Sequence, residues 1–95
     1  MSKGYWVVSH LSTDESVLPA YAAAARPPIE AAGGRLIFRG KPARVHESGV
    51  NDFTVVVEFP SLEKAIAAYE SPAYQAAVKV IEGKVKRDVR IVEGA

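Results

Sequence analysis

The segment FTVVVEF, residues 53–59, constrains the fold most, because it is the clearest β-strand in the chain and carries apolar side chains on both faces. Successive side chains of a strand point to opposite sides of its sheet. One face of this strand carries Phe53, Val55, Val57 and Phe59. The other face carries Val56 between a threonine and a glutamate. The sheet therefore needs a full cover on one side and at least a partial cover on the other.

Other stretches extend this strand into a complete domain. Aromatic and β-branched residues favour strands, and apolar residues at 3.6-residue spacing indicate helices. Strands are predicted at Gly4–Leu11, Arg35–Arg39 and Asp88–Glu93, and helical stripes at 18–32, 62–69 and 74–81. Residues 43–47 are expected to continue the second strand as an edge arm.

Local signals place the ends of these elements. Pro27 and Pro28 lie within the first helical stripe and predict a kink or a restart, because proline lacks an amide donor. Gly33 and Gly34 predict the end of that helix. Ser71 and Pro72 interrupt the second helical region, where serine suits an N-cap and proline suits the first helical position. We therefore predict that a new helix begins at Pro72.

The resulting order is strand, helix, strand, strand, helix, strand. It predicts a single domain over residues 1–95 with an α+β fold, a ferredoxin-like βαββαβ sandwich of helices on one face of an antiparallel sheet. The other strands are also apolar on both faces, since Tyr5, Val7 and Leu11 oppose Trp6 and Val8 in the first strand, and Leu36 and Phe38 oppose Ile37 in the second. The uncovered face would therefore expose several large apolar side chains. A few hundred Å² of such surface is worth several kcal/mol when covered, at about 25 cal/mol per Å². We therefore expect a homodimer that packs through the open sheet face.

Composition excludes several classes of function. The chain has no cysteine, which rules out disulfides, thiolate nucleophiles and Cys-based metal sites. Its formal net charge of +1 does not favour a nucleic-acid partner. No signal peptide and no run of apolar residues long enough for a membrane span are evident. We expect a cytoplasmic protein without a membrane partner.

Several short motifs, taken together, carry a family resemblance. These are GYWVV, GGR at 33–35, EFPS at 58–61, SPAYQ at 71–75 and the closing VEG. The chain resembles the bacterial domain-of-unknown-function family 1330, within the dimeric α+β barrel superfamily. The resemblance implies a ferredoxin-like protomer and a dimer whose two sheets form a barrel. It implies no particular reaction.

Candidate site residues are few. His10, near the end of the first strand, is a candidate general base; the alternative is a strand-end histidine bonded to the backbone or to water. His46 lies far away in the sequence, so the two histidines form no metal motif, and we expect neither a metal nor a cofactor.

An arginine and three tyrosines are candidates for ligand binding. Arg39 is predicted to share a strand face with Arg35 and Ile37 and to clamp a carboxylate; a surface ion pair with a glutamate is the alternative. Tyr21 and Tyr74 lie on core stripes, and their hydroxyls would meet in a helix–sheet cleft; packing alone is the alternative. Tyr69 is the third tyrosine candidate.

Two functions fit these residues. In the first, the protein binds or converts a small acidic or aromatic molecule in the cleft without a cofactor. In the second, it is a non-catalytic dimeric binding or regulatory module. RNA binding ranks last, because the FTVVVEF strand lacks the basic and aromatic pattern of an RNA-recognition sheet.

Overall fold

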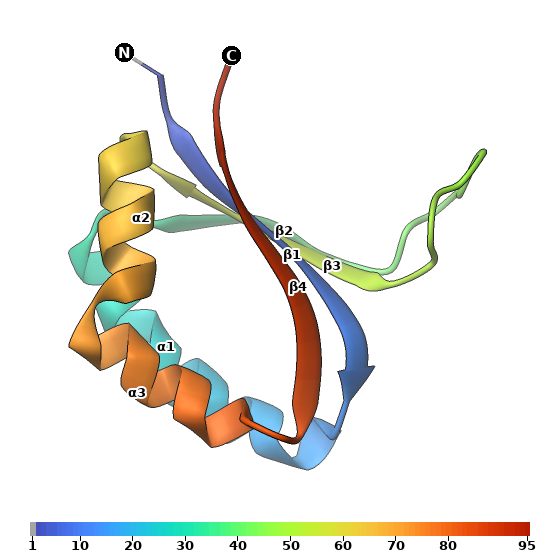
Figure 1. Cartoon of the computed structure of the whole chain (residues 1–95), viewed down its shortest axis with the longest axis horizontal. Helices are drawn as coiled ribbons and strands as arrows, with labels where there is room; N and C mark the ends of the chain where they lie inside the picture. The colour runs from blue at the N-terminus through green and yellow to red at the C-terminus, as the bar shows by residue number, and fades with distance from the viewer. Residues whose placement is uncertain (1) are drawn as a thin grey trace.

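A computed structural model describes residues 2–95 and contains one sheet covered by helices on one face (Figure 1). The elements are β1 (Gly4–Thr13), η1 (Glu15–Val17), α1 (Leu18–Ala31), β2 (Arg35–Gly40), β3 (Phe53–Phe59), α2 (Leu62–Glu70), α3 (Pro72–Ile81) and β4 (Val85–Glu93). All neighbouring strands are antiparallel, in the order β2-β3-β1-β4. The predicted ferredoxin-like α+β sandwich is confirmed.

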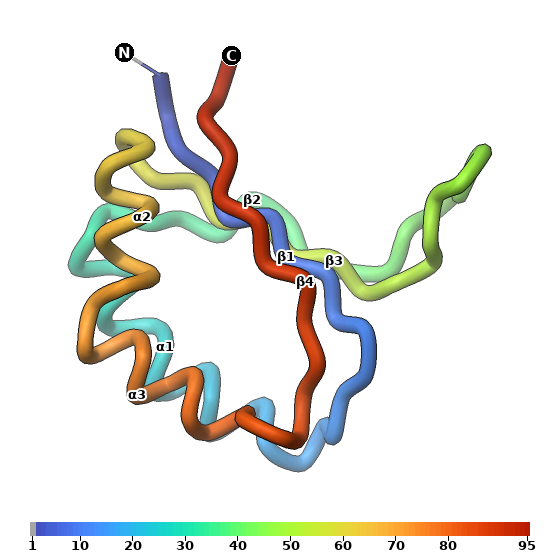
Figure 2. Tube along the Cα trace, viewed as in Figure 1, coloured from blue at the N-terminus to red at the C-terminus, as the bar shows by residue number. Residues whose placement is uncertain are grey.

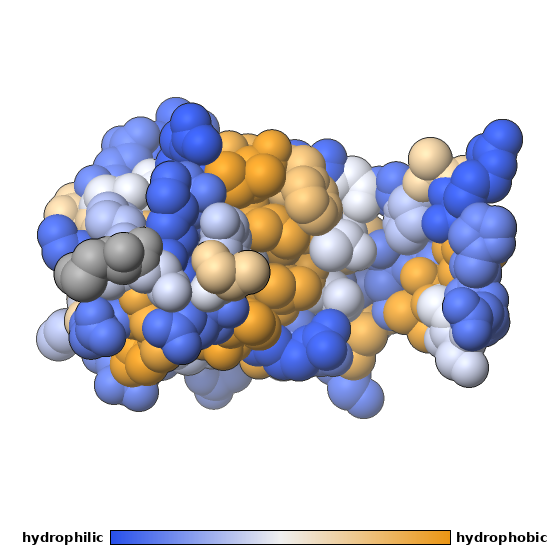
Figure 3. Space-filling model, turned by 90° about the horizontal axis from the view of Figure 1, so that it is seen from above, coloured by the Kyte–Doolittle hydropathy of each residue, from blue (hydrophilic) through white to orange (hydrophobic). Residues whose placement is uncertain are grey.

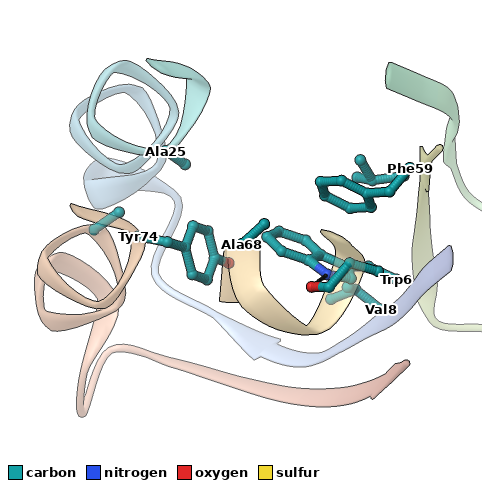
Figure 4. Close-up of a cluster of buried hydrophobic side chains, with 9 residues drawn as sticks. Trp6, Val8, Ala25, Phe59, Ala68 and Tyr74 are labelled. Atoms are coloured by element: carbon teal, nitrogen blue, oxygen red, sulfur yellow. Dashed lines mark hydrogen bonds between the residues drawn. The ribbon is translucent and has the colours of Figure 1, made fainter. Parts of the chain in front are cut away.

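The strand register aligns apolar side chains in layers beneath the helices. Trp6 is opposite Val57 on one side and Ile91 on the other, and Val8 is opposite Val55 and Val89 in the same way. Helix residues close the core above them, and Figure 4 shows Tyr74 from α3 and Ala25 from α1 pointing toward this layer. The largest fully buried side chains are Trp6, Tyr74 and Phe59.

One serine ends α2 and begins α3, as the sequence predicted. The Ser71 hydroxyl donates to the carbonyl of Ala68 at 2.8 Å and accepts from the amide of Tyr74 at 3.2 Å. Pro72 takes the first position of α3, where its missing amide donor costs no helical bond. The path of the chain turns between the two helices, as the Cα trace shows (Figure 2). The break therefore lets two short helices cover one curved sheet.

The first helix differs from the prediction. α1 continues through Pro27 and Pro28 to Ala31, without a restart. Both prolines lie in its last two turns. Pro27 has no amide proton to donate to the carbonyl of Ala23. Because Ala23 is exposed, water can bond that carbonyl instead. The predicted stop is confirmed by Gly33, which has a φ of 80° directly after the helix.

The connection between β2 and β3 was also predicted differently. Residues 43–47 form no strand, so the expected edge arm is wrong; the segment projects from the body as an irregular arm (Figure 1). The amide of Gly49 donates to the carbonyl of His46 at 2.9 Å, and Lys41 Nζ donates to the carbonyl of Asn51 at 3.0 Å. These bonds satisfy backbone carbonyls that would otherwise pair with a neighbouring strand.

The face of the sheet opposite the helices carries the expected apolar residues. Val7 pairs with Val56, which in turn pairs with Phe38 of β2. Phe38 is 53% exposed and Val92 is 48% exposed. Figure 3, seen from above the sheet, shows apolar surface gathered over the middle of the molecule.

Candidate functional site

A pocket of about 400 Å³ lies between α1 and the helix-facing side of the sheet. Its walls are largely apolar. Trp6, Val8, Val55 and Val57 come from the sheet, and Ala25 and Ile29 come from α1. The charged lining is mainly basic, with Arg26, Arg39 and Arg87; Arg35 also lines the pocket, although its guanidinium bonds Glu58. Glu30 is the one acidic lining residue of the described chain. The pocket therefore offers apolar walls to the apolar part of a small molecule and basic side chains to an anionic group.

The most buried polar cluster of the pocket joins three elements: α1, α3 and β4. Tyr21 and Tyr74 bring their hydroxyl oxygens to 2.5 Å from each other. Arg87 Nη1 donates to the Tyr21 hydroxyl at 3.1 Å, and Arg87 Nη2 donates to the Tyr74 hydroxyl at 3.3 Å. The Arg87 guanidinium also lies 5.3 Å from the centre of the Tyr21 ring, within cation–π distance. Two hydroxyls and one aromatic face therefore hold this cation.

Arg87 has no carboxylate partner in the described part of the chain. Ion pairs there join Glu58 to Lys3 and Arg35, and Asp88 to Arg90, all away from this cluster. Arg87 is half-buried, and even partial burial of an arginine without an opposite charge has a cost that hydroxyl dipoles offset only in part. The cluster therefore carries a positive charge that no carboxylate of the described chain balances.

Burial strongly raises the pKa of Tyr74, and the neighbouring Tyr21 raises it further. Tyr74 therefore keeps its proton at neutral pH. The two tyrosines carry two hydroxyl protons, and one of these protons forms the hydrogen bond between the two hydroxyls. One hydroxyl proton remains to donate to a bound oxygen atom.

His10 lines the same pocket, on β1, and is half-buried. The register places it opposite Phe53 on one neighbouring strand and opposite Arg87 on the other. The imidazole and Phe53 ring centres are 5.4 Å apart. Burial lowers the pKa of His10, and the charges of Arg87 and Arg39 lower it further. The imidazole is therefore neutral near pH 7 and able to accept a proton.

Arg39 reaches the pocket for a reason that the sequence did not show. β2 has a bulge between Leu36 and Phe38, so Leu36 pairs with Val57 and Arg39 pairs with Val55. These two residues face the helices. Arg35 pairs with Glu58 and Phe38 with Val56, so both lie on the open face. The prediction that Arg39 shares a face with Arg35 is therefore wrong, because an extra residue reverses the alternation.

The guanidinium of Arg39 lies 5.6 Å from the centre of the Phe53 ring. The alternative ion pair of Arg39 with a glutamate is absent from the described residues, since Glu58 bonds Lys3 and Arg35 instead. Arg39 is thus an exposed cation at the mouth of the pocket, available to a ligand.

Tyr69 lies behind the pocket and does not line it. Its ring is 5.6 Å from Trp6 and 5.2 Å from Tyr74, measured between ring centres. Trp6 in turn donates its indole N–H to the carbonyl of Ala65 at 2.8 Å. Tyr69 and Trp6 therefore fix the position of Tyr74, and a direct contact of Tyr69 with a ligand stays a prediction.

The sequence interpretation missed Arg87. It began the last strand at Asp88, whereas β4 begins at Val85. The signal was present, because Val85, Arg87, Val89 and Ile91 alternate with charged residues. An arginine in the apolar phase of a strand must meet either the core or a ligand. Arg26 and Glu30, on the pocket side of α1, were also missed.

Residues 2–95 contain no group of three or more His, Cys, Asp or Glu side chains arranged to hold a metal ion. No helix in this part of the chain has both the length and the apolar character needed to cross a membrane.

The sheet order and the helical cover define a ferredoxin-like α+β protein with a basic pocket between helix and sheet. The family model described as "Domain of unknown function (DUF1330)" matches residues 3–95. The chain therefore belongs to this family, which confirms the resemblance.

Solved structures share the fold. A protein of unknown function from Rhodopseudomonas palustris is 16% identical, with a TM-score of 0.74 over 99% of this chain and 83% of that chain. A dimeric protein of unknown function with a ferredoxin-like fold, from Bacteroides fragilis, is 14% identical, with a TM-score of 0.59 over 97% of this chain and 95% of that chain.

A third structure, from Nitrosomonas europaea, is provisionally named an antibiotic biosynthesis monooxygenase. It is 16% identical, with a TM-score of 0.57 over 98% of this chain and 89% of that chain. At these identities the likeness concerns the fold alone. No curated protein matches the chain in sequence.

Proposed function

We propose that this protein binds a small organic anion with an aromatic or apolar body, without a cofactor, in the pocket between α1 and the sheet. One observation carries the proposal. The half-buried Arg87 guanidinium bonds two tyrosine hydroxyls, and no carboxylate of the described chain lies within ion-pair distance of it. A bound carboxylate would supply the missing charge through charge-assisted hydrogen bonds.

The remainder of the pocket supports this ligand class. A volume of about 400 Å³ suits a molecule of one ring with a short acidic side chain. Its apolar walls would cover the ring, while Arg39 and Arg87 approach it from the two edges of the sheet. Both cations attract an anion, whereas a neutral molecule of the same shape would gain only the apolar contacts.

We also propose that the protein acts as a homodimer through its open sheet face. Phe38 and Val92 expose about half of their surfaces there, beside Val7 and Val56. A two-fold axis would let one patch cover the same patch of a second copy. The Bacteroides fragilis structure of the same fold is described as dimeric, which supports the assembly.

Calorimetry tests the ligand class directly. Phenylacetate should bind to the purified protein, and its neutral isostere phenylacetamide should bind at least tenfold more weakly. Arg87→Met, which keeps the length of the side chain, should weaken the binding of phenylacetate at least tenfold.

The matched control for this variant is Arg90→Met. Arg90 lies on the same strand, but it is exposed and close to Asp88, with 3.6 Å between Nε and Oδ1. Its replacement should leave phenylacetate binding within about twofold of the parent protein. Failure of phenylacetate and related aromatic carboxylates to bind, or equal binding by Arg87→Met, would contradict the proposal.

The alternative is a non-catalytic dimeric module in which the cluster only stabilises the fold. One observation favours it: every buried side-chain nitrogen and oxygen of residues 2–95 already has a hydrogen-bond partner. In that case no anion binds, yet Arg87→Met still lowers the melting temperature strongly.

A further inference from the structure

A continuous set of side chains crosses the pocket floor from one edge of the sheet to the other. The Arg39 guanidinium is 5.6 Å from the centre of the Phe53 ring, which is 5.4 Å from the centre of the His10 ring. His10 pairs across the strands with Arg87, which bonds the hydroxyls of Tyr21 and Tyr74. A neutral imidazole thus lies between two guanidinium groups.

These groups differ in what they can do. Arg39 is exposed and free of carboxylates in the described chain, so it can take a carboxylate at the pocket mouth. Arg87 and the spare hydroxyl proton of the tyrosine pair form a partly buried set of donors, which suits an oxygen atom that gains negative charge. His10 lies between the two ends and can accept a proton.

We propose that the protein catalyses proton transfer at the carbon next to the carbonyl of a 2-oxo acid, with His10 as the general base. This inference rests on the proposed function and names its substrate class. A 2-oxo acid has the two required groups: its carbonyl oxygen would take the place at Arg87 that the carboxylate of a simple acid occupies, and its own carboxylate would bind Arg39. An aromatic ring on C3 would lie against Phe53 and the apolar walls.

The step needs no co-reactant. An imidazole nitrogen of His10 takes a proton from C3, and the C3–H bond breaks. Its electron pair forms the C2=C3 double bond, and the carbonyl π pair moves to the oxygen, which becomes an enolate oxygen. Arg87 and a tyrosine hydroxyl donate hydrogen bonds to that oxygen. The imidazolium then returns a proton to C3, or to the oxygen to give the enol, and His10 is neutral again.

The core positions the hydrogen-bond donors formed by Tyr21, Tyr74 and Arg87. Trp6 and Tyr69 pack against the Tyr74 ring, with ring centres 4.7 and 5.2 Å away, so the hydroxyl end of Tyr74 is fixed before any ligand arrives. Donors that are already oriented stabilise a developing charge without reorganisation.

Exchange of the C3 protons of phenylpyruvate with deuterium oxide tests the inference. Proton NMR should show loss of the C3 signal at least about 100-fold faster with the full-length protein than in buffer alone, as expected for general-base catalysis. His10→Gln should reduce the exchange to within a few-fold of the buffer rate and leave the Kd for phenylpyruvate within about threefold. His46→Gln, a histidine replacement in the projecting arm, should exchange at the parent rate.

The outcomes separate the two proposals. Phenylpyruvate that binds but exchanges at the buffer rate, or that exchanges as fast with His10→Gln, would overturn the proton-transfer inference and leave anion binding intact. Binding of phenylacetate without binding of phenylpyruvate would overturn the 2-oxo acid class alone. If neither acid binds, both proposals are wrong. Tyr74→Phe is a second test in case His10→Gln does not fold. The rate of exchange with Tyr74→Phe should fall at least tenfold, and a far-UV spectrum shows whether this variant is folded. An unchanged rate counts against the inference.

Discussion

Tyr21 and Tyr74, 53 positions apart in the sequence, meet hydroxyl to hydroxyl at 2.5 Å in the space between α1, α3 and the sheet. Both hydroxyls accept hydrogen bonds from Arg87 on the edge strand β4. The contact joins α1 to α3 and β4, which lie far from α1 along the chain. It therefore serves the stability of the fold as well as the chemistry of the pocket.

Removal of the Tyr74 hydroxyl should destabilise the protein. Tyr74→Phe keeps the ring in the core but deprives the half-buried Arg87 of one of its two hydroxyl partners. The free energy of unfolding should fall by about 1.5–3 kcal/mol, the range for a hydrogen bond to a charged group. Urea denaturation followed by tryptophan fluorescence measures it.

Tyr5→Phe is the control for that variant. Tyr5 lies on the open face of the sheet, and its hydroxyl bonds Glu58 at 3.1 Å near the surface. Replacement of Tyr5 by phenylalanine should lower the free energy of unfolding by less than Tyr74→Phe does. Equal losses from the two variants would contradict a special role for the buried cluster.

The stability of the protein should depend on pH through His10. Arg87 on the neighbouring strand β4 and Arg39 on the far edge strand β2 line the pocket with the imidazole, and α1 brings Arg26 and Glu30 to the same pocket. Burial and the two former arginines lower the pKa of His10 below its ordinary value of 6.5.

The sign follows from which state takes up the proton. Below pH 6.5 the unfolded chain protonates at His10 while the folded chain does not, so the free energy of unfolding falls as pH decreases. The loss levels off below the lowered pKa. His10→Gln should lack this contribution, so the parent should lose more stability than the variant on going from pH 7.5 to about pH 5. Parallel curves for the two proteins would show that the imidazole is not perturbed.

The cap shared by α2 and α3 gives a third prediction. Ser71→Ala removes one hydroxyl that bonds both the end of α2 and the start of α3, and should cost about 1–2 kcal/mol. Thermal unfolding by circular dichroism measures the loss. Ser12→Ala, at an exposed position of β1, should change the melting temperature by much less. An unaffected Ser71→Ala protein would mean that Pro72 alone sets the start of α3.

The proposed dimer should depend on the outer face of β2. Phe38→Glu places a charge on the open sheet face, where Phe38 is 53% exposed in the single chain. Light scattering should show the parent protein at twice the mass of this variant at micromolar concentration. Ile66→Glu, at a 38% exposed position of α2 on the opposite side of the sheet, should keep the parent mass. A parent protein that is itself monomeric would refute the dimer.

Much of the fold follows from short-range chemistry, and so the sequence predicted it. Alternation along Phe53–Phe59, the glycines after α1 and the Ser71-Pro72 cap each act within a few residues, and each is confirmed. The meeting of Tyr21 with Tyr74 was also anticipated, because both lie on the core stripes of helices that cover the same face.

The rest depends on contacts that local patterns do not record. No letter in RLIFRG marks the bulge of β2, which arises from how this strand pairs with β3. Pro27 and Pro28 are helix breakers by propensity, yet α1, which packs mainly against α3, stays intact to Ala31. Arg87 was missed because the start of β4 was placed three residues too late.

The bulge in β2 has a mechanical consequence. By shifting the alternation between Leu36 and Phe38, it places Phe38 on the open face and Arg39 on the helix-facing side of the same edge strand. One contributes to the patch proposed for a second copy, and the other stands at the pocket entrance. A second copy that packs against Phe38 would therefore restrict the motion of the adjacent Arg39. Dimer formation and ligand binding would then be coupled through two neighbouring residues.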